Sequence, residues 1–368
     1  MKFRCERDTL ADAVSTAQRA VAARTGAMPV LSGLRVSLTP GSVELVGTDL
    51  ELTIRVSVPA ETDGEGSAVV PARLFAEILQ KLEAGRVDVE LEDADARIRG
   101  GRFAMTLRTL AAAEFPRLPQ IDSEGVRVDA GAFAEALRQV VPAASKDDAR
   151  PILTGVLLTA SSDGLRLVAT DSYRLALRDL QGVSMLAEGQ KVLVAAKGLG
   201  EVQRLLTSAG TDQIDVVLGE REVLFRVGTA EVTTRLIEGE FPNYQQLIPS
   251  GYPNRLTVAR DALQSAVNRV RLVGGGKDQA PIRLGMSAEG LELSATAQDV
   301  GEAHEEVEAK YEGTDLTVAF NSQFLLDGID ATATAEVVVE SIDPLKPAVM
   351  RATDSGDFLY LLMPVRIA

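Results

Sequence analysis

The sequence contains the same short blocks in the same order more than once, and this repetition constrains the fold more than any other feature. The block VGTDLEL at residues 46–52 returns as VATDSYRL at 168–175, with a weaker copy, LSATAQD, at 293–299. The block EFPRL at 114–118 returns as EFPNY at 240–244. The offsets are about 120 to 130 residues, the size of a whole domain. The chain is therefore predicted to use one domain three times.

Two segments rich in Pro, Gly and Ser, at residues 119–125 and 249–253, separate the copies. Boundaries placed there predict domains at 1–122, 123–250 and 251–368. A chain of 368 residues is also longer than one ordinary hydrophobic core requires.

Each copy shows the same pattern of secondary structure. Apolar residues at helical spacing predict first helices at residues 8–23, 131–144 and 260–273, and second helices at 72–82, 197–206 and 322–329. Between the two helices of the first copy, alternate residues from Leu50 to Val58 are apolar, as in a strand with one buried face. Each domain is therefore predicted to be α+β, with two helices packed on antiparallel sheet.

The net charge of −15 by itself argues against a nucleic-acid partner, because Lys and Arg make the phosphate contacts. The charges are segregated, however. Residues 255–277 carry five basic and one acidic residue, whereas residues 285–313 carry one basic and eight acidic residues. Basic residues gather on or beside the predicted helices, namely Arg19, Arg24, Arg73, Lys81, Arg138, Lys146, Arg150, Lys197 and Arg204. These are either solvated helix faces or one cationic surface that holds a phosphate backbone without reading sequence.

The first and third copies carry opposite charge in their strands. Residues 96–110 include four arginines, among them Arg97 and Arg102, and no acid. Glu302, Glu305 and Glu306 lie in an acidic strand of the third copy. This pattern indicates head-to-tail association of two chains into a closed ring, which would hide the exposed sheet edges. The alternative is that both clusters are only solvated surface.

No catalytic, metal or cofactor constellation is expected. Cys5 is the only cysteine and is predicted to be buried, and His304 is the only histidine and lies in a solvated charge run. The GGGK run at residues 274–277 lacks the spacing of a phosphate-binding loop. Asp49 and Asp171 follow Thr at equivalent positions, which predicts a turn role. The start has no export signal and no apolar run is long enough to cross a membrane, so a cytoplasmic location is expected.

The chain resembles the beta subunit of bacterial DNA polymerase III, the beta sliding clamp, along its whole length. The resemblance is carried by the opening MKF, GTDLE at 47–51, ATDSYRLA at 169–176, GEFPNY at 239–244 and the tail MPVRI at 363–367. It implies a head-to-tail homodimer of six domains around double-stranded DNA, with helices facing the DNA and a continuous outer sheet. It also implies a processivity factor without its own catalysis, opened by a clamp loader that hydrolyses ATP.

The resemblance further implies three sets of site residues. A peptide-binding cleft between the second and third domains would receive the polymerase alpha subunit, the clamp loader, repair polymerases and mismatch-repair proteins. Its matching positions are Leu153, Thr170, Arg174, Leu175, Leu177, Pro242, Leu247, Leu361, Leu362, Met363, Pro364, Val365 and Arg366. The matching DNA-binding positions are Arg24, Arg73, Lys146, Arg150, Lys197, Arg269 and Lys277. The matching dimer-interface positions are Arg97, Arg102, Met105, Leu107, Leu272, Val273, Glu302, Glu305 and Glu306.

Two alternatives to the replicative clamp are open at this point. One is a paralogous ring that acts in repair or in resistance to an inhibitor. The other, a metabolic enzyme, is disfavoured by the missing nucleophile, metal and cofactor motifs.

Overall fold

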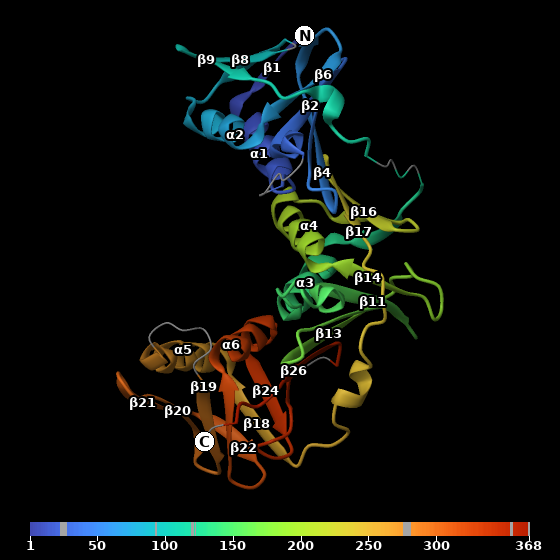
Figure 1. Cartoon of the computed structure of the whole chain (residues 1–368). Coiled ribbons are helices and arrows are strands. Elements are labelled where there is room, and N and C mark those ends of the chain that lie inside the picture. The colour runs from blue at the N-terminus through green and yellow to red at the C-terminus, as the bar shows by residue number, and fades with distance from the viewer. Residues whose placement is uncertain are drawn as a thin grey trace. The chain divides into compact units, whose positions relative to one another are not determined.

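The computed structural model describes residues 1–22, 28–92, 94–118, 121, 123–274, 281–353 and 356–366 (Figure 1). The α-helices are α1 (Arg7–Gln18), α2 (Ala72–Lys81), α3 (Ala130–Val140), α4 (Ala196–Ala209), α5 (Arg260–Val270) and α6 (Ser322–Ala331). Short 3₁₀ turns are η1 (Pro29–Ser32), η2 (Ala112–Glu114), η3 (Val141–Ala143), η4 (Pro151–Thr154), η5 (Tyr244–Leu247) and η6 (Arg271–Gly274).

All named strand pairs are antiparallel. The first repeat holds β1 (Lys2–Glu6), β2 (Gly33–Thr39), β3 (Ser42–Thr48), β4 (Leu52–Pro59), β5 (Glu61–Asp63), β6 (Gly66–Pro71), β7 (Arg86–Leu91), β8 (Asp95–Gly100) and β9 (Phe103–Arg108). The second holds β10 (Val126–Asp129), β11 (Gly155–Ser161), β12 (Gly164–Thr170), β13 (Arg174–Gln181), β14 (Lys191–Ala195), β15 (Gln213–Leu218), β16 (Glu222–Val227) and β17 (Ala230–Arg235). The third holds β18 (Asn254–Ala259), β19 (Pro281–Ser287), β20 (Gly290–Ala297), β21 (Gly301–Val307), β22 (Ala309–Glu312), β23 (Leu316–Asn321), β24 (Glu336–Ser341), β25 (Ala348–Ala352) and β26 (Phe358–Leu362).

The order of elements confirms the predicted repeat. Each repeat consists of a strand, a helix, four strands, a second helix and three further strands. The first and third repeats each have one additional short strand, β5 and β22, within the set of four. The predicted α+β class with paired helices on antiparallel sheet is therefore correct.

The first helix of each repeat ends earlier than its apolar spacing predicts. In the first repeat, α1 ends at Gln18, and the next N–H groups bond three residues back, Val21 to the Gln18 carbonyl at 3.0 Å. In the second, Pro142 supplies no N–H and disfavours helical geometry at Val141, so α3 gives way to η3. In the third, η6 follows α5 directly. The periodicity continues through these tighter turns, which explains the overestimate.

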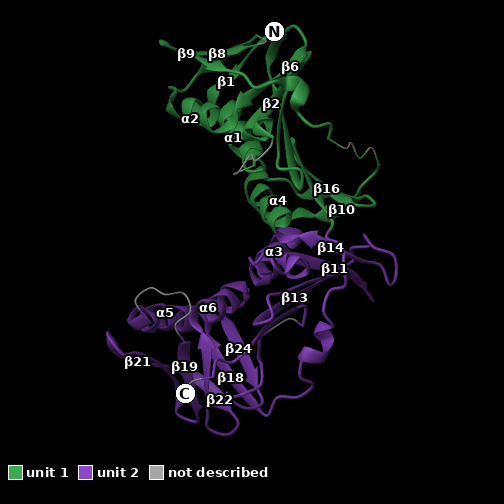
Figure 2. Cartoon of the chain, in the orientation of Figure 1, with its two compact units in different colours: residues 1–131, 197–236 green, residues 132–196, 237–368 purple. Residues whose placement is uncertain are grey.

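The sheets cross the boundaries between repeats. One eight-stranded sheet has the order β10-β15-β16-β17-β4-β3-β2-β6, and one nine-stranded sheet has the order β14-β11-β12-β13-β26-β25-β24-β18-β22. Two smaller sheets, β5-β1-β7-β8-β9 and β21-β20-β19-β23, complete the fold. As a result the compact units are residues 1–131 with 197–236 and residues 132–196 with 237–368, which divide the second repeat between them (Figure 2). The domain boundaries near residues 122 and 250 stay predictions.

Two strand pairs join successive repeats, and we call them the first seam (β4 with β17) and the second seam (β13 with β26). At the first seam Leu52 lies opposite Thr234, and at the second Arg174 lies opposite Leu362. One backbone bond extends each pair, from Arg235 N–H to the Glu51 carbonyl (3.0 Å) and from Met363 N–H to the Tyr173 carbonyl (2.9 Å). The two seams therefore share one backbone frame.

The predicted turn role of the Thr-Asp pairs is confirmed at both seams. Asp49 Oδ1 accepts hydrogen bonds from the N–H groups of Glu51 (3.0 Å) and Leu52 (2.7 Å). Asp171 Oδ1 accepts them from the equivalent residues, Tyr173 (2.9 Å) and Arg174 (3.0 Å). Both turns place a non-glycine residue in the left-handed region, Leu50 at φ 76° and Ser172 at φ 79°.

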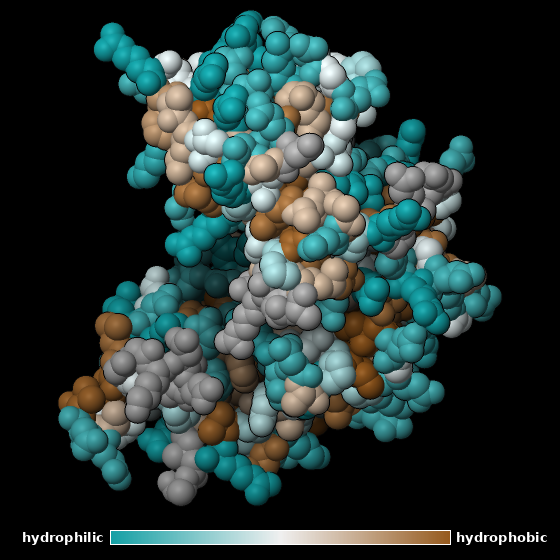
Figure 3. Space-filling view, turned by 45° about the horizontal axis from the view of Figure 1, so that its top comes forward, coloured by the Kyte–Doolittle hydropathy of each residue, from teal (hydrophilic) through white to brown (hydrophobic). Residues whose placement is uncertain are grey.

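Apolar side chains of the helices and of one sheet face form the core of each repeat. Cys5 is buried, as predicted, and burial raises the pKa of its thiol to about 11. Hydrophilic side chains cover most of the face seen in Figure 3, with apolar ones in small patches. Among the residues described, no helix combines the length and the apolar character needed to span a bilayer.

Candidate functional site

We call the face of each seam that points away from the helices its outer face. The outer face of the second seam is apolar. Leu175 and Leu177 of β13 lie opposite Leu361 and Leu359 of β26, and all four are buried. They form one cluster with Val349 and other buried residues, and the segment 237–252 packs against it through partly buried Ile237, Phe241, Ile248 and Tyr252. The structure therefore brings together three of the residues predicted for the peptide cleft, Leu175, Leu177 and Leu361.

The other predicted cleft residues lie on several segments of the same compact unit. Thr170 ends β12, Leu153 is in η4, and Leu362 ends β26; all three are buried. Pro242 and Leu247 lie exposed on the covering segment, Leu247 in η5. Met363, Val365 and Arg366 are exposed and Pro364 half-buried in the tail, and Val365 N–H bonds the Ala319 carbonyl at 2.7 Å.

Arg174 occupies the helix-facing side of the same seam, and its side chain is only 7% exposed. It donates to Asp171 Oδ2 (3.1 Å), to the Pro142 carbonyl and to Asp327 of α6. Its guanidinium also lies 4.3 Å from the ring centroid of Phe324. A buried cation is tolerated only with such a complete set of partners, so Arg174 ties β13 to α6.

Sequence reasoning missed the partners that α6 and β26 supply. Tyr360 donates its hydroxyl to the Phe324 carbonyl at 2.8 Å, and burial raises the pKa of Tyr360 against the opposing charge of Arg174. Tyr173 stacks on Phe324 with centroids 6.4 Å apart and is 59% exposed, which makes it an aromatic surface beside the tail. The EFPNY block and the repeated Thr-Asp turn pointed to this region, but no local signal marks Phe324 or Asp327.

Five of the predicted DNA-binding residues are described by the structure, and they lie on helices or beside them. Arg73 of α2 pairs with Glu77 (2.9 Å), Arg150 pairs with Asp147 (3.0 Å), and Lys197 of α4 pairs with Asp49. Lys146 lies exposed after η3. Arg24 and Lys277 lie outside the described residues.

Arg269, predicted for DNA, and Glu305, predicted for the dimer interface, are partners within one chain. Arg269 Nε lies 3.0 Å from Glu305 Oε2, and this hydrogen bond lowers the pKa of the Glu305 carboxyl. The pairing joins α5 to β21. Arg269, predicted to contact DNA, and Glu305, predicted to contact a second chain, therefore each partly neutralise the other's charge. His304 on the same strand is exposed, as expected, and bonds Glu292 at 3.1 Å.

The strands with opposite charge end their sheets. β9 closes one end of the five-stranded sheet and β21 one end of the four-stranded sheet. Along β9, Phe103 is 45% exposed, Met105 is half-buried and Leu107 is buried. Leu107 is thus already buried by contacts within its own chain. Phe103, which was not predicted as an interface residue, is the more exposed apolar side chain. Arg97 pairs with Glu92 at 3.2 Å.

A surface pocket adjoins the free end of β9. Ile78 of α2, Leu82 just after it and Phe103 at the start of β9 form its apolar part. The charged residues of its lining are Glu77, Lys81, Glu83 and Arg102. In the other unit, Leu272 of η6 is 69% exposed and Val273 is half-buried. A pocket with apolar and charged walls is thus present in one unit, and an exposed leucine in the other.

Three family models of the DNA polymerase III beta subunit match the chain in order. The N-terminal domain model covers residues 1–119, the central domain model 127–243 and the C-terminal domain model 245–366. Together they cover nearly the whole sequence.

Whole proteins and solved structures agree with these models. The beta sliding clamp of Streptomyces coelicolor is 36% identical over 385 residues, and that of Staphylococcus aureus 30% identical over 377, each covering all of this chain and at least 99% of the relative. The sliding clamp of Bartonella birtlesii, solved with griselimycin bound, has a TM-score of 0.92 at 30% identity, and that of Bacillus subtilis 0.91 at 28%, both over the full length of both chains. From the three ordered domain matches and this full-length similarity, the chain belongs to the family of the bacterial DNA polymerase III beta subunit, the beta sliding clamp.

Proposed function

We propose that this chain is a DNA sliding clamp: two copies join head to tail, enclose duplex DNA and tether the replicative polymerase through the second seam. The observation that carries the proposal is the pair of sheet ends, β9 with arginines beside it and β21 with glutamates along it. An edge strand offers its backbone groups to another strand, and a heterologous contact made twice can close a ring. Three domains from each chain, at 1–122, 123–250 and 251–368, would make a ring of six.

The subunit contact would bury apolar side chains at its centre. We propose that Leu272 and Val273 of one chain enter the pocket lined by Ile78, Leu82 and Phe103 of the other, beside Met105 and Leu107. Arg97 and Arg102 would face Glu302 and Glu306, while Glu305 remains shared with Arg269. Burial at the centre supplies affinity and the charged rim supplies orientation.

The dimer is tested by light scattering of the Leu272→Glu variant. A carboxylate buried against Ile78, Leu82 and Phe103 is costly, so we expect monomers at concentrations where the unmodified chain is dimeric. Leu345→Glu, at another exposed leucine (68%), is the matched control and should stay dimeric. A monomeric unmodified chain, or equal behaviour of both variants, would refute the proposed contact.

The proposed DNA surface consists of Arg24, Arg73, Lys146, Arg150, Lys197, Arg269 and Lys277. Several of these side chains pair with carboxylates in the same chain, such as Arg73 with Glu77 and Lys197 with Asp49. Cations that are partly neutralised in this way suit a ring that slides, because contacts to phosphates read no bases and hold no single register.

A loading assay tests this function directly. With a clamp loader and ATP, the chain should remain on nicked circular duplex DNA and leave the same DNA once it is made linear. Equal loss from both forms would contradict the proposal. Replacing Lys146 and Arg150 by Glu should weaken retention and reduce its salt dependence, whereas Arg127→Glu on β10 should not.

The second seam is the proposed docking site for short peptide segments of the polymerase alpha subunit, the clamp loader and repair proteins. An apolar cluster with a few polar anchors suits an extended peptide, and exposed Met363 adapts to varied partners. Deleting residues 363–368 should abolish polymerase stimulation and leave the dimer intact, because β26 ends at Leu362. Undiminished stimulation would contradict the assignment.

In this proposal the clamp carries out no chemistry, needs no cofactor and works in the cytoplasm, and the loader hydrolyses the ATP. A paralogue kept for repair or inhibitor resistance would share the same geometry, and no observation on this chain favours it.

A further inference from the structure

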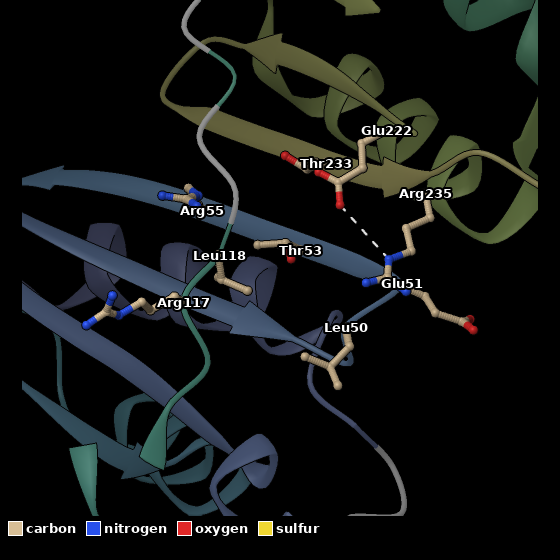
Figure 4. Close-up of a pocket in the computed structure, with 9 residues that line it drawn as sticks. All are labelled: Leu50, Glu51, Thr53, Arg55, Arg117, Leu118, Glu222, Thr233 and Arg235. Atoms are coloured by element: carbon tan, nitrogen blue, oxygen red, sulfur yellow. Dashed lines mark ion pairs between the residues drawn. The ribbon is translucent and has the colours of Figure 1, made fainter. Parts of the chain in front are cut away.

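A small cavity of about 70 Å³ lies on the outer face of the first seam, within one compact unit. Figure 4 shows Leu50, Thr53 and Leu118 between Arg55 and Arg117 on one side and Arg235 on the other. β4 and β17 form its floor, and the segment carrying Arg117 and Leu118 passes over them. This volume is far below that of a small-molecule site, so the cavity can take a single side chain rather than a whole small ligand.

The cavity occupies the place in the first seam that the apolar cluster occupies in the second. Thr53 lies opposite Thr233, as Leu175 lies opposite Leu361, and the EFPRL block covers it as the EFPNY block covers the leucines. Phe115 and Leu118 pack on a small apolar cluster of their own, which anchors the covering segment. The first seam therefore retains the frame of a docking site, with different side chains.

The lining is cationic with an apolar centre. Arg55, Arg117 and Arg235 outnumber the lining carboxylates Glu51 and Glu222. Arg235 is 63% exposed, and its Nε lies 4.0 Å from Glu222 Oε1, the outer limit for an ion pair. Guanidinium groups present paired donors that match a carboxylate, so an incoming acid can displace this long contact.

Leu50 is an independent sign of function at this cavity. It adopts φ 76°, a region that costs a leucine about 1 to 2 kcal/mol, and its side chain is 38% exposed at the cavity wall. Strained residues of this kind collect at binding sites. Glycine would relieve the strain, so an exposed leucine here indicates a contact that needs its side chain.

We infer that this cavity is a second docking site, which binds an acidic, leucine-containing extended segment of a partner protein. Carboxylates of the segment would bind Arg117 and Arg235, and a leucine would pack between Leu50 and Leu118. Glu51 and Glu222 at the border would repel a continuous phosphate backbone, which favours a peptide with spaced carboxylates. The inference stands apart from the proposed ring, because the contacts involve one unit of one chain.

Fluorescence anisotropy with the full chain tests the site. The probe is a labelled hexapeptide of alternating aspartate and leucine, and its asparagine–leucine counterpart is the comparison. We expect the acidic peptide to bind at least about tenfold more tightly, and Arg117→Glu or Arg235→Gln each to weaken it about tenfold. Arg127→Glu, on the outer strand β10 of the same sheet and 77% exposed, should change the affinity less than twofold.

Any of these results would overturn the inference: equal affinity for both peptides, equal losses in the Arg117→Glu and Arg127→Glu variants, or loss of binding on deletion of residues 363–368. The last would place the peptide at the second seam. Displacement by micromolar oligothymidylate that depends on Arg117 would identify a phosphate site and would also contradict it. Polymerase stimulation should be unchanged in Arg117→Glu, which separates a failure here from a failure of the clamp function.

Discussion

At the first seam Thr53 of β4 lies opposite Thr233 of β17, whereas at the second seam Leu175 of β13 lies opposite Leu361 of β26. Two residues further along the strands, on the same outer face, Arg55 lies opposite Glu231 at the first seam and Leu177 lies opposite Leu359 at the second. The two seams share the same backbone hydrogen bonds, the same turn closed by an aspartate, and a residue in the left-handed region at the same position. One frame therefore carries two surfaces, and the side chains alone decide which partner chemistry each can bind.

On the helix-facing side the polarity is reversed: there the first seam is apolar and the second seam is polar. The first seam buries Leu52 there, and the second buries Arg174 among Asp171, Asp327 and Tyr360. At the second seam the polar contacts are directed inward and the apolar groups outward. At the second seam a buried ionic network around Arg174, rather than a core leucine, holds β13 in place. The outer face of the same strand can therefore be apolar.

The largest expected difference between the seams concerns Arg174. Arg174→Met leaves the carboxylates of Asp171 and Asp327 without their buried cation, so the free energy of unfolding should fall by about 3 to 5 kcal/mol. Arg166→Met breaks a more exposed pair with Asp179 on the neighbouring strand and should cost about 1 kcal/mol or less. Urea denaturation followed by circular dichroism measures both. Similar losses would mean that the network is not the special support of the second seam.

Exchanging the outward side chains tests the seams directly. Leu361→Thr places a hydroxyl in a buried apolar cluster and should destabilise the chain by about 2 to 3 kcal/mol. Thr233→Leu, at the half-buried equivalent position, should change stability by no more than about 0.5 kcal/mol. Only the first exchange should reduce polymerase stimulation. Equal effects in the two denaturation curves would contradict the distinction.

The shared frame predicts equal losses at the equivalent threonines. Thr48 Oγ1 accepts from Leu50 N–H (3.0 Å) and bonds the Leu52 carbonyl (3.1 Å). Thr170 Oγ1 makes the equivalent two bonds, with Ser172 N–H (3.2 Å) and the Arg174 carbonyl (2.6 Å), while Thr48 Oγ1 has a further contact with Thr53 Oγ1 (2.9 Å). Thr48→Val and Thr170→Val should each cost about 1 to 2 kcal/mol in the same denaturation assay. A difference above about 1 kcal/mol would show that the frames are not equivalent in energy.

The smallest expected effect concerns the left-handed residues. Leu50→Gly and Ser172→Gly should each raise the free energy of unfolding by about 0.5 kcal/mol, because relief of strain slightly exceeds the entropic cost of glycine. Leu50→Ala keeps the strain and should bring no such gain. At the first seam the stabilised Leu50→Gly variant should also bind the acidic peptide more weakly. Tighter binding would contradict the role given to Leu50.

Much of the fold could be predicted because its signals are local. The repeat, the helix positions and the Thr-Asp turns depend on residues within a few positions of one another, as the Asp49 and Asp171 bonds illustrate. Helix ends were overestimated where Pro142 and 3₁₀ turns intervene. The site was predicted through the family resemblance at Leu175, Leu177 and Leu361, but Phe103, Tyr173 and Phe324 were missed because no local pattern marks them.

The sequence by itself determined that one α+β domain is used three times, because hydrophobic period and turn chemistry act over short stretches of chain. Only the tertiary structure decided that β4 pairs with β17 and β13 with β26, and that Arg174 reaches Asp327, 153 residues away. It also decided that Arg269 and Glu305 neutralise each other. Strand register and ion pairing between distant segments depend on how whole faces pack, and that packing is not written in any local pattern.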